Sequence, residues 1–436
     1  MYLVRILVYG FAKFLVIAST RIFFSRIYQK GEERFNRNNK PTMLSSNHPN
    51  TMLDCLNVAE RIPMQMTHFL GNASMFQSKF NNWFFSTFFV IPIQRKQDTG
   101  GRKFDNKKSF AKVNTFLESG GALFIAPEGG SNIARRLRPL KSGTARMALN
   151  TENENDFKLG LEILPIGQNY SDQLSFRSQL FMNVGEPIKV ADYKTAYEKD
   201  NYAAATAITE ELDKRMRALL VDTKDDEEDA FIRKVEEICQ TENKLPFNEV
   251  VYRSQNLIAN WRKLQIENPT EANALQTDIE SYFSILEKNK TPDSVASQIH
   301  QGAKSTWWLR MIGVVIGFPF FIYGWANNFL ANYIPKLLMD KSGLYIGYNS
   351  CVKTLSGIFT YPIFYGLQIW LVSQFTSGSY IIWGYILSVI VLGLFAWWYK
   401  DFVKNTFSGQ RFIKEKNQGK EIRQQLVEKI NKNLIS

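Results

Sequence analysis

Short apolar runs alternate with amphipathic stretches over the first two hundred residues of the chain. The apolar runs predict buried strands near 42–46, 64–69, 90–93, 122–126, 162–167 and 180–184. Apolar positions at helical spacing predict helices between several of these strands, notably at 51–60, 107–118 and 143–150. Because strands that alternate with helices are typical of α/β proteins, we expect a central mixed sheet flanked by helices, with functional residues at the strand ends.

The second half of the chain has two further patterns. Residues 201–303 carry many charges on long amphipathic stretches, which predicts a helical region. No charged residue occurs between Thr354 and Tyr399, a run of 46 positions. This length predicts two membrane spans, at 356–375 and 379–399.

A third apolar stretch, Met311–Pro335, begins the region 304–400 that we expect to be embedded in the membrane. Pro319 lies inside this stretch, and a proline favours a bend in a helix. We therefore interpret the stretch as a re-entrant hairpin bent near Pro319, an interfacial segment or a span. The basic residues of 401–436 predict that this tail lies on the cytoplasmic side.

The segment 1–24 is predicted to form a helix that lies in the membrane interface. It is apolar, but Arg5, Lys13 and Arg21 spread over about 160° of a helical wheel, which disfavours a spanning helix. An interfacial helix would place these charges near lipid headgroups and its apolar side chains in the acyl region.

The charge balance indicates an anionic partner. The formal net charge is +12, and the apolar spans favour lipid headgroups or phosphorylated substrates over nucleic acid. The three cysteines, Cys55, Cys239 and Cys351, lie far apart without disulfide or metal spacing. We interpret the acidic run 225–229 as a solvated face or linker, so a metal site is not expected.

A histidine and an aspartate with five residues between them form the first candidate for chemistry. His48 is one of three histidines, with His68 and His300, and Asp54 follows it. A neutral imidazole accepts a proton near neutral pH, and a carboxylate on its other nitrogen fixes the tautomer. Pro49 suits the first position of a helix, which would place His48 at the helix entrance. A histidine that only caps a helix is the alternative.

The second candidate lies at the end of the strand predicted at 122–126. The sequence Pro-Glu-Gly-Gly-Ser at 127–131 follows this strand, and glycines there let backbone amides approach a phosphate closely. A cluster of basic side chains, which suit a phosphomonoester, comes next: Arg135, Arg136, Arg138 and Lys141. The two motifs together indicate a general base beside a phosphate site.

These motifs resemble those of the glycerolipid acyltransferases, which acylate glycerol 3-phosphate or lysophosphatidate. Asn47-His48 with Asp54 matches the family's His–Asp motif, and the run 126–129 matches its Phe-Pro-Glu-Gly motif, with alanine in place of phenylalanine. Weaker counterparts occur at 90–95, 163–167 and 184–188. The resemblance implies an acyltransferase domain at 25–200.

One spacing departs from the family pattern. Most members separate the histidine and the aspartate by four residues, whereas this chain has five. The extra residue turns Asp54 by about 100° around a helix, so the pairing with His48 must be regained in the loop at Pro49. The longer spacing, the Gly-Gly form of the second motif and the run 137–143 resemble the branch that includes fungal glycerol 3-phosphate/dihydroxyacetone phosphate acyltransferases.

The resemblance implies a role for each motif residue. His48 and Asp54 would be the catalytic pair, with His48 taking a proton from the acceptor hydroxyl as it attacks an acyl-CoA or acyl carrier protein thioester. The acceptor phosphate would be bound by Arg95, Glu128, Gly129, Gly130 and Ser131, with Asn47, Arg138 and Lys141 as further contacts. No metal and no cofactor is implied, because the acyl thioester is a co-substrate.

We therefore expect a membrane-bound O-acyltransferase of phospholipid biosynthesis, with its catalytic domain on the cytoplasmic face and glycerol 3-phosphate or dihydroxyacetone phosphate as acceptor. Lysophosphatidate is the alternative acceptor. A thioesterase or lipase-like hydrolase and a non-catalytic membrane lipid-binding protein are more distant alternatives. The family motifs end near Ile188, so the spans would only anchor the enzyme, and a chain ending near Lys304 would keep its activity.

Overall fold

The computed structural model contains two compact units. It describes residues 2–35, 39–63, 65–72, 78–94, 106–376, 378–414 and 419–435. The first unit consists of Met1–Asp222 together with Leu344–Thr354, and the second of Thr223–Gly343 together with Leu355–Ser436. A short segment from the C-terminal half of the chain therefore belongs to the first unit.

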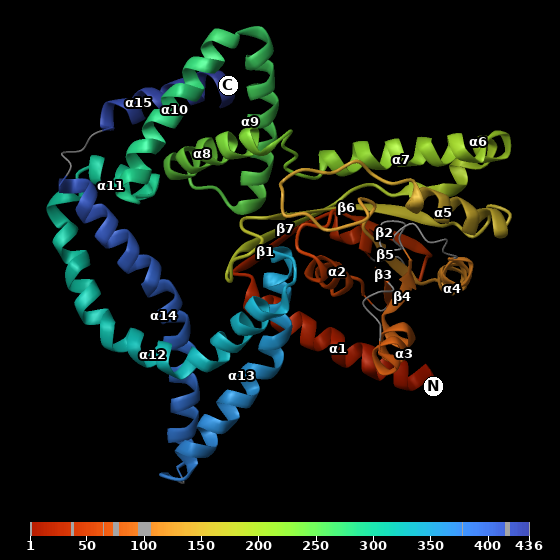
Figure 1. The fold of residues 1–436 in the computed structure, drawn as a ribbon, viewed down its shortest axis with the longest axis horizontal. Helices are drawn as coiled ribbons and strands as arrows, with labels where there is room; N and C mark the ends of the chain where they lie inside the picture. The colour runs from red at the N-terminus through yellow and green to blue at the C-terminus, as the bar shows by residue number, and fades with distance from the viewer. Residues whose placement is uncertain are drawn as a thin grey trace. The chain divides into compact units, whose positions relative to one another are not determined.

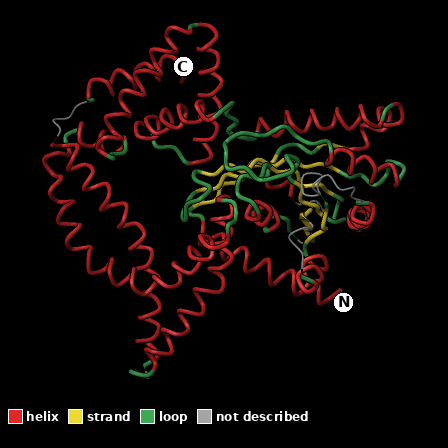
Figure 2. The backbone as a smooth tube through the Cα atoms, viewed as in Figure 1, coloured by secondary structure: helices red, strands yellow, loops and turns green. Residues whose placement is uncertain are grey.

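The first unit is built on a sheet of eight described strands (Figures 1 and 2). The strands are β1 (Arg26–Lys30), β2 (Thr42–Ser46), β3 (Thr67–Asn72), β4 (Val90–Ile93), β5 (Ala122–Ile125), β6 (Glu162–Tyr170), β7 (Gln179–Val184) and β8 (Ile188–Lys189). Their order is β1-β7-β6-β2-β5-β3-β4, and β8 pairs with β6. Since β2 runs parallel to β5 and β6 while β7 runs antiparallel to β6, the sheet is mixed, and the predicted fold class is confirmed.

The six strands predicted from the sequence are present, with changes at their ends. Strand β3 begins at Thr67, later than predicted, and β6 continues to Tyr170, beyond the predicted end at 167. Strands β1 and β8 were not predicted. Strand β1 lies at the edge of the sheet and is bounded by the exposed charges Arg26 and Lys30, so it lacks the apolar run by which buried strands are recognised.

Seven helices accompany the strands in the described part of the first unit. They are α1 (Tyr2–Phe23), α2 (Met52–Ala59), α3 (Lys79–Phe88), α4 (Lys107–Glu118), α5 (Gly143–Glu154), α6 (Lys194–Lys199) and α7 (Asn201–Ala218). Helix α2 begins at Met52, so the prediction that Pro49 occupies its first position is wrong. Helix α7 was expected in the charged helical region, yet it packs on the sheet through buried residues such as Ile208 and Leu212.

The alternation of side chains along the strands separates two hydrophobic layers. Met43, Leu123 and Ile163 face one layer, which includes buried residues of α4, α5 and α7. The neighbouring residues, such as Leu44 and Phe124, face the other layer, which includes Val58 of α2. This period of two is the pleat of a strand, and each fully buried aliphatic side chain contributes roughly 1.5–3 kcal/mol. Figure 1 shows α5 and α7 on one side of the sheet and α2 on the other.

Helix α1 contacts the first unit along much of its length. The Tyr9 hydroxyl accepts a hydrogen bond from the Thr67 amide (3.1 Å), and the Lys13 ammonium donates to the Ile62 carbonyl. Farther along, Arg21 pairs with Glu60 (3.4 Å). Lys13 and Arg21 therefore contact the rest of the first unit, while apolar side chains of α1 such as Leu7, Phe11 and Phe14 are exposed.

The described part of the second unit is helical. Its helices are α8 (Asp226–Glu242), α9 (Phe247–Glu267), α10 (Pro269–Asn289), α11 (Asp293–His300), α12 (Trp307–Ser342), α13 (Asn349–Ser373, whose first turn belongs to the first unit), α14 (Ser379–Lys414) and α15 (Lys420–Ile430). Within the described residues, α1, α12, α13 and α14 are long and apolar enough to cross a bilayer. Such helices are those of an integral membrane protein.

Helix α12 continues through both Pro319 and Pro335, so the stretch Met311–Pro335 is not a re-entrant hairpin. Figure 1 shows it as one bent helix. It packs against α14, where the Cβ of any residue replacing Gly324 would lie 1.9 Å from the Leu392 carbonyl oxygen. The Asn328 side chain donates to the Val389 carbonyl (3.1 Å) and accepts from the Tyr365 hydroxyl (2.7 Å), which joins α12 to α14 and α13.

Candidate active site

The topology of the sheet brings the two motifs together. Strands β2 and β5 are parallel neighbours, with Ser45 opposite Ile125. His48 follows the carboxyl end of β2 and Glu128 follows that of β5, so both lie at the same edge of the sheet. The backbone also joins them, because the Asn132 amide donates to the His48 carbonyl oxygen (3.2 Å).

His48 and Asp54 form a hydrogen-bonded pair. Nδ1 of His48 lies 3.0 Å from Oδ2 of Asp54. The extra residue of the motif is taken up before α2 begins, where Thr51 adopts a positive φ of 49°. The pairing is therefore regained in the loop after Pro49, as the spacing required. Since Nδ1 is directed at Asp54, Nε2 is the ring nitrogen that remains for a substrate hydroxyl.

Asp54 is fully buried and accepts three hydrogen bonds. Besides His48, they come from the Asn50 amide to Oδ2 (2.7 Å) and from the Tyr170 hydroxyl to Oδ1 (2.5 Å). Burial raises the pKa of Asp54, and the His48 contact, the Tyr170 hydroxyl and the Asn50 amide oppose that rise. The donors thus favour the ionised carboxylate that would hold an imidazolium.

Tyr170 belongs to the site, although no motif in the sequence marks it. It lies on β6, and alternate residues of a strand point to the same face. Tyr170 therefore shares the face of Leu164 and Ile166, which is the α2 side of the sheet. The strand predicted at 162–167 ended too early to include it. Had the alternation been extended by three residues, it would have placed Gln168 and Tyr170 on the face toward Asp54.

Glu128 links the two motifs and is almost completely buried. Its Oε1 accepts the His48 amide (3.2 Å), and its Oε2 accepts the backbone amide and the Nε of Arg138 (both 3.2 Å). The carboxylate thus holds Arg138 and the backbone of His48. It cannot bind a phosphate itself, so its place in a phosphate site is to position Arg138.

The two glycines permit close approaches in the turn after β5. Gly129 has a φ of 75°, and a Cβ there would lie 2.5 Å from Nζ of Lys141, so a side chain would displace this lysine. Gly130 accepts a hydrogen bond at its carbonyl from the Arg138 guanidinium. The turn therefore gathers two of the basic side chains, Arg138 and Lys141, beside the backbone of 129–130.

The remaining motif residues have mainly backbone partners. The Asn47 side chain donates to the Gln168 carbonyl (3.0 Å) and accepts a hydrogen bond from the Gln168 amide (2.8 Å), which ties the turn 47–54 to β6. The Ser131 hydroxyl accepts the Thr51 amide (3.3 Å). Arg95 lies outside the described residues, so its role stays a prediction.

The other two histidines are separate from this site. The His68 ring lies 4.1 Å from the Phe116 ring, centroid to centroid, and burial with the nearby Arg5 charge lowers the pKa of His68 to about 4. His300 packs against Phe412 in the second unit. Burial and the Asp54 charge raise the pKa of the Cys55 thiol well above its usual range, which opposes a thiolate nucleophile. The described residues contain no group of three or more side chains arranged to bind a metal.

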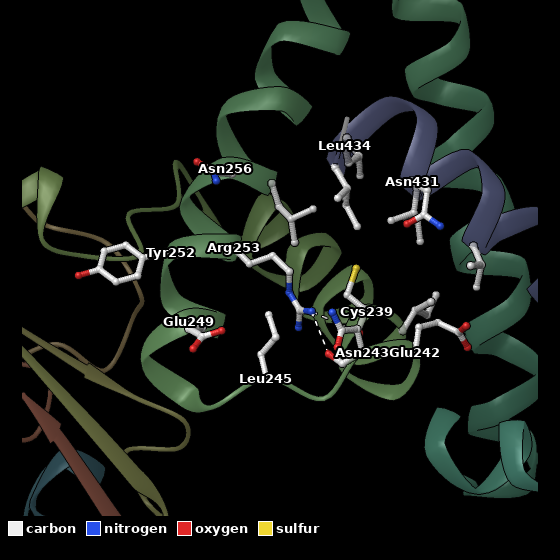
Figure 3. Close-up of a pocket in the computed structure, with 15 residues that line it drawn as sticks. Cys239, Glu242, Asn243, Leu245, Glu249, Tyr252, Arg253, Asn256, Asn431 and Leu434 are labelled. Carbon is white, nitrogen blue, oxygen red and sulfur yellow. Dashed lines mark hydrogen bonds between the residues drawn. The ribbon is translucent and has the colours of Figure 1, made fainter.

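A cavity of about 460 Å³ lies in the second unit, between α8, α9 and the C-terminal residues near Leu434 (Figure 3). Arg253 extends into it and donates to the backbone carbonyls of Cys239 (3.3 Å) and Asn243 (3.2 Å) at the end of α8. This cation therefore caps a helix C-terminus, which accounts for its position structurally.

Comparisons with known proteins agree with the motifs. Residues 26–168 match the family described as Acyltransferase. Glycerol-3-phosphate O-acyltransferase 1 of Saccharomyces cerevisiae is 26% identical over 201 residues, which are 45% of this chain and 26% of the yeast protein. Glycerol-3-phosphate O-acyltransferase 2 of the same yeast is 38% identical over 88 residues, which are 20% of this chain and 12% of that protein.

A solved structure is also similar to part of the chain. It is the 1-acyl-sn-glycerophosphate acyltransferase PlsC from Thermotoga maritima, with a TM-score of 0.35 and 14% identity, over 48% of this chain and 80% of that chain. The family match and the yeast relatives confirm the resemblance predicted from the motifs, and the match to the Acyltransferase family covers residues 26–168. The matched region spans only about a quarter of the length of the first yeast relative.

Proposed function

We propose that this protein transfers a fatty acyl group from an acyl thioester to a hydroxyl of a glycerol phosphate, either glycerol 3-phosphate or dihydroxyacetone phosphate. The observation that carries the proposal is the 3.0 Å contact between His48 Nδ1 and Asp54 Oδ2, held beside the turn that carries Glu128 and Arg138. A base adjoining a basic turn suits an acceptor that has both a hydroxyl and a phosphate.

The chemistry proceeds as a direct transfer. Nε2 of His48 takes the proton of the acceptor hydroxyl while the hydroxyl oxygen attacks the thioester carbonyl carbon. The new C–O bond forms, the tetrahedral intermediate collapses with cleavage of the C–S bond, and the imidazolium returns its proton to the departing thiolate. Asp54 stabilises the imidazolium between these steps. General-base catalysis of this kind contributes about 10²–10⁴-fold.

The phosphate of the acceptor binds the basic turn, which we define as residues 128–141 after β5. Arg138 and Lys141 lie over the backbone of Gly129 and Gly130, where a phosphate would meet both cations. Arg95 is proposed as a further ligand. The names of the two yeast relatives support glycerol 3-phosphate as acceptor. Acyl-CoA or acyl carrier protein is the proposed donor, and a cytoplasmic catalytic domain would give access to such substrates.

Acyl transfer by the purified full-length protein tests the proposal. Labelled acyl-CoA is supplied with glycerol 3-phosphate, dihydroxyacetone phosphate or lysophosphatidate in turn, in detergent micelles. We expect ester formation with a glycerol phosphate, and a reduction of about 10²–10⁴-fold for His48→Ala with the same thermal unfolding midpoint. Transfer only to lysophosphatidate would favour the alternative acceptor. Equal activity of wild type and a folded His48→Ala protein would refute the proposed base.

A further inference from the structure

The segment Leu344–Thr354 joins two apolar helices yet belongs to the unit that contains His48. It begins after Gly343, whose φ of 64° ends α12, and it includes the first turn of α13. Both flanking helices are long and apolar enough to cross a bilayer. A connection between membrane helices therefore forms part of the acyltransferase unit.

One contact of this segment reaches residues 47–54, which carry His48 and Asp54 and are called the catalytic turn below. The Thr51 hydroxyl lies 3.4 Å from the Gly347 carbonyl oxygen, to which it donates a hydrogen bond. Gly347 is buried, and a Cβ at this position would lie 2.6 Å from the Tyr345 ring and 3.4 Å from the Thr51 methyl group. Thr51 is also the residue whose backbone takes up the extra position between His48 and Asp54.

A second contact reaches the turn that holds the basic residues. The Tyr345 hydroxyl accepts a hydrogen bond from the Ile133 amide (3.1 Å). Ile133 follows Asn132, whose amide donates to the His48 carbonyl, and it lies five residues before Arg138. Tyr345 therefore holds the backbone between the catalytic histidine and the arginine proposed to bind phosphate.

Gln173 contacts the segment and both turns, through Ser350, Asn50 and Ile133. Its backbone carbonyl accepts hydrogen bonds from the Asn50 side chain (3.0 Å) and the buried Ser350 hydroxyl (2.5 Å). Its side chain donates to the Ile133 carbonyl (2.8 Å). The Asn50 amide donates to Asp54, so Asn50 links this carboxylate to Gln173. Gln173 is linked in turn to the segment 344–354, directly through Ser350 and through Ile133 to Tyr345.

We propose that Leu344–Thr354 is a positioning element of the active site, in which Tyr345 and Ser350 fix the basic turn against the catalytic turn through Ile133 and Gln173. The proposal rests on the proposed acyl transfer for its kinetic consequence. Neither side chain needs to touch a substrate. Tyr345 acts on the turn that ends at Arg138, and Ser350 acts on the turn that contains Asn50.

Two hydroxyl deletions in the full-length protein test this assignment. Tyr345→Phe should raise the acceptor KM about three- to tenfold with little change in kcat, because it loosens the phosphate-binding turn. Ser350→Ala should lower kcat by a similar factor, because it loosens the Asn50 turn. The matched controls are Tyr380→Phe, whose side chain is exposed on α14, and Ser373→Ala, whose exposed hydroxyl bonds to the Trp370 carbonyl and the neighbouring Gln374 side chain; both should match wild type.

Hydrogen exchange of the amides of 128–138 gives a readout that does not depend on activity. The Ile133 amide should exchange several-fold faster in Tyr345→Phe than in wild type, while exchange in the sheet is unchanged. If both deletions match the controls in kinetics and exchange, the positioning role is wrong. If wild type transfers no acyl group at all, the proposed function fails, and the exchange of Ile133 alone decides the positioning role.

Discussion

At the scale of single residues, the Tyr170 hydroxyl donates to Asp54 at 2.5 Å and opposes the rise in the pKa of that carboxyl that burial causes. Tyr170→Phe removes this donor, so the pKa of Asp54 should rise further. Because the proposed reaction needs an ionised Asp54 to stabilise the His48 imidazolium, the acid limb of the kcat/KM profile should move to higher pH. The profile measured from pH 5 to 9 checks this.

The control for this substitution is Tyr202→Phe, since Tyr202 is exposed on α7. It should leave the profile of wild type unchanged. Burial, followed by the Asp54 charge, raises the pKa of Tyr170 well above its usual range, so its hydroxyl stays protonated over the whole profile and cannot itself produce the limb. An acid limb in Tyr170→Phe at the wild-type position would show that the hydroxyl does not act through the pKa of Asp54.

At the scale of elements, the strands and their order explain which site residues could be predicted. His48 and Glu128 follow apolar runs that any buried strand requires, so their place at strand ends was visible in the sequence. The places of Tyr170 and Gln173 were not visible, because their contacts with the turn 47–54 depend on the pairing of β6 with β2, more than a hundred residues away in sequence. The left-handed turn at Thr51 was also not predicted, since threonine rarely adopts it.

The membrane helices offer a test of packing at the same scale. A Cβ at position 324 would lie 1.9 Å from the Leu392 carbonyl oxygen of α14, so Gly324→Ala must separate two helix backbones. Overpacking of this kind should reduce the free energy of unfolding by about 1–3 kcal/mol. We therefore expect the thermal unfolding midpoint of the purified protein to fall by several degrees. Gly384→Ala is the matched control, because a Cβ there meets no atom within 4 Å. Equal midpoints for both variants would contradict the close α12–α14 contact.

At the scale of the whole molecule, the chain passes from the first unit to the second, back, and to the second again. The C-terminal helix completes the second unit. Arg423 of α15 donates to both oxygens of Asp293 (2.7 and 2.9 Å) and to Glu242 (2.7 Å), and the Asp293 side chain is fully buried. Removing one partner of such a pair costs about 3–5 kcal/mol, because it leaves an uncompensated buried charge.

The sequence alone led to the expectation that a chain ending near Lys304 keeps its activity. Because Leu344–Thr354 is part of the first unit, we now expect this chain to lose activity. Such a chain lacks Leu344–Thr354 from the first unit and Arg423 from the second. It should lose the hydrogen bonds that Gly347, Tyr345 and Ser350 make with Thr51, Ile133 and Gln173. The proposed acyl transfer should therefore fall at least tenfold.

A second truncation separates the two losses. A chain ending near Ile413 keeps Leu344–Thr354 but lacks Arg423, so its second unit should unfold at lower temperature while its acyl transfer at low temperature stays close to that of the full chain. Both truncations are assayed for acyl transfer and thermal unfolding after purification in the same detergent. Wild-type kcat/KM in a monodisperse chain ending near Lys304 would show that the spans only anchor the enzyme, because catalysis would then not need the segment between α12 and α13.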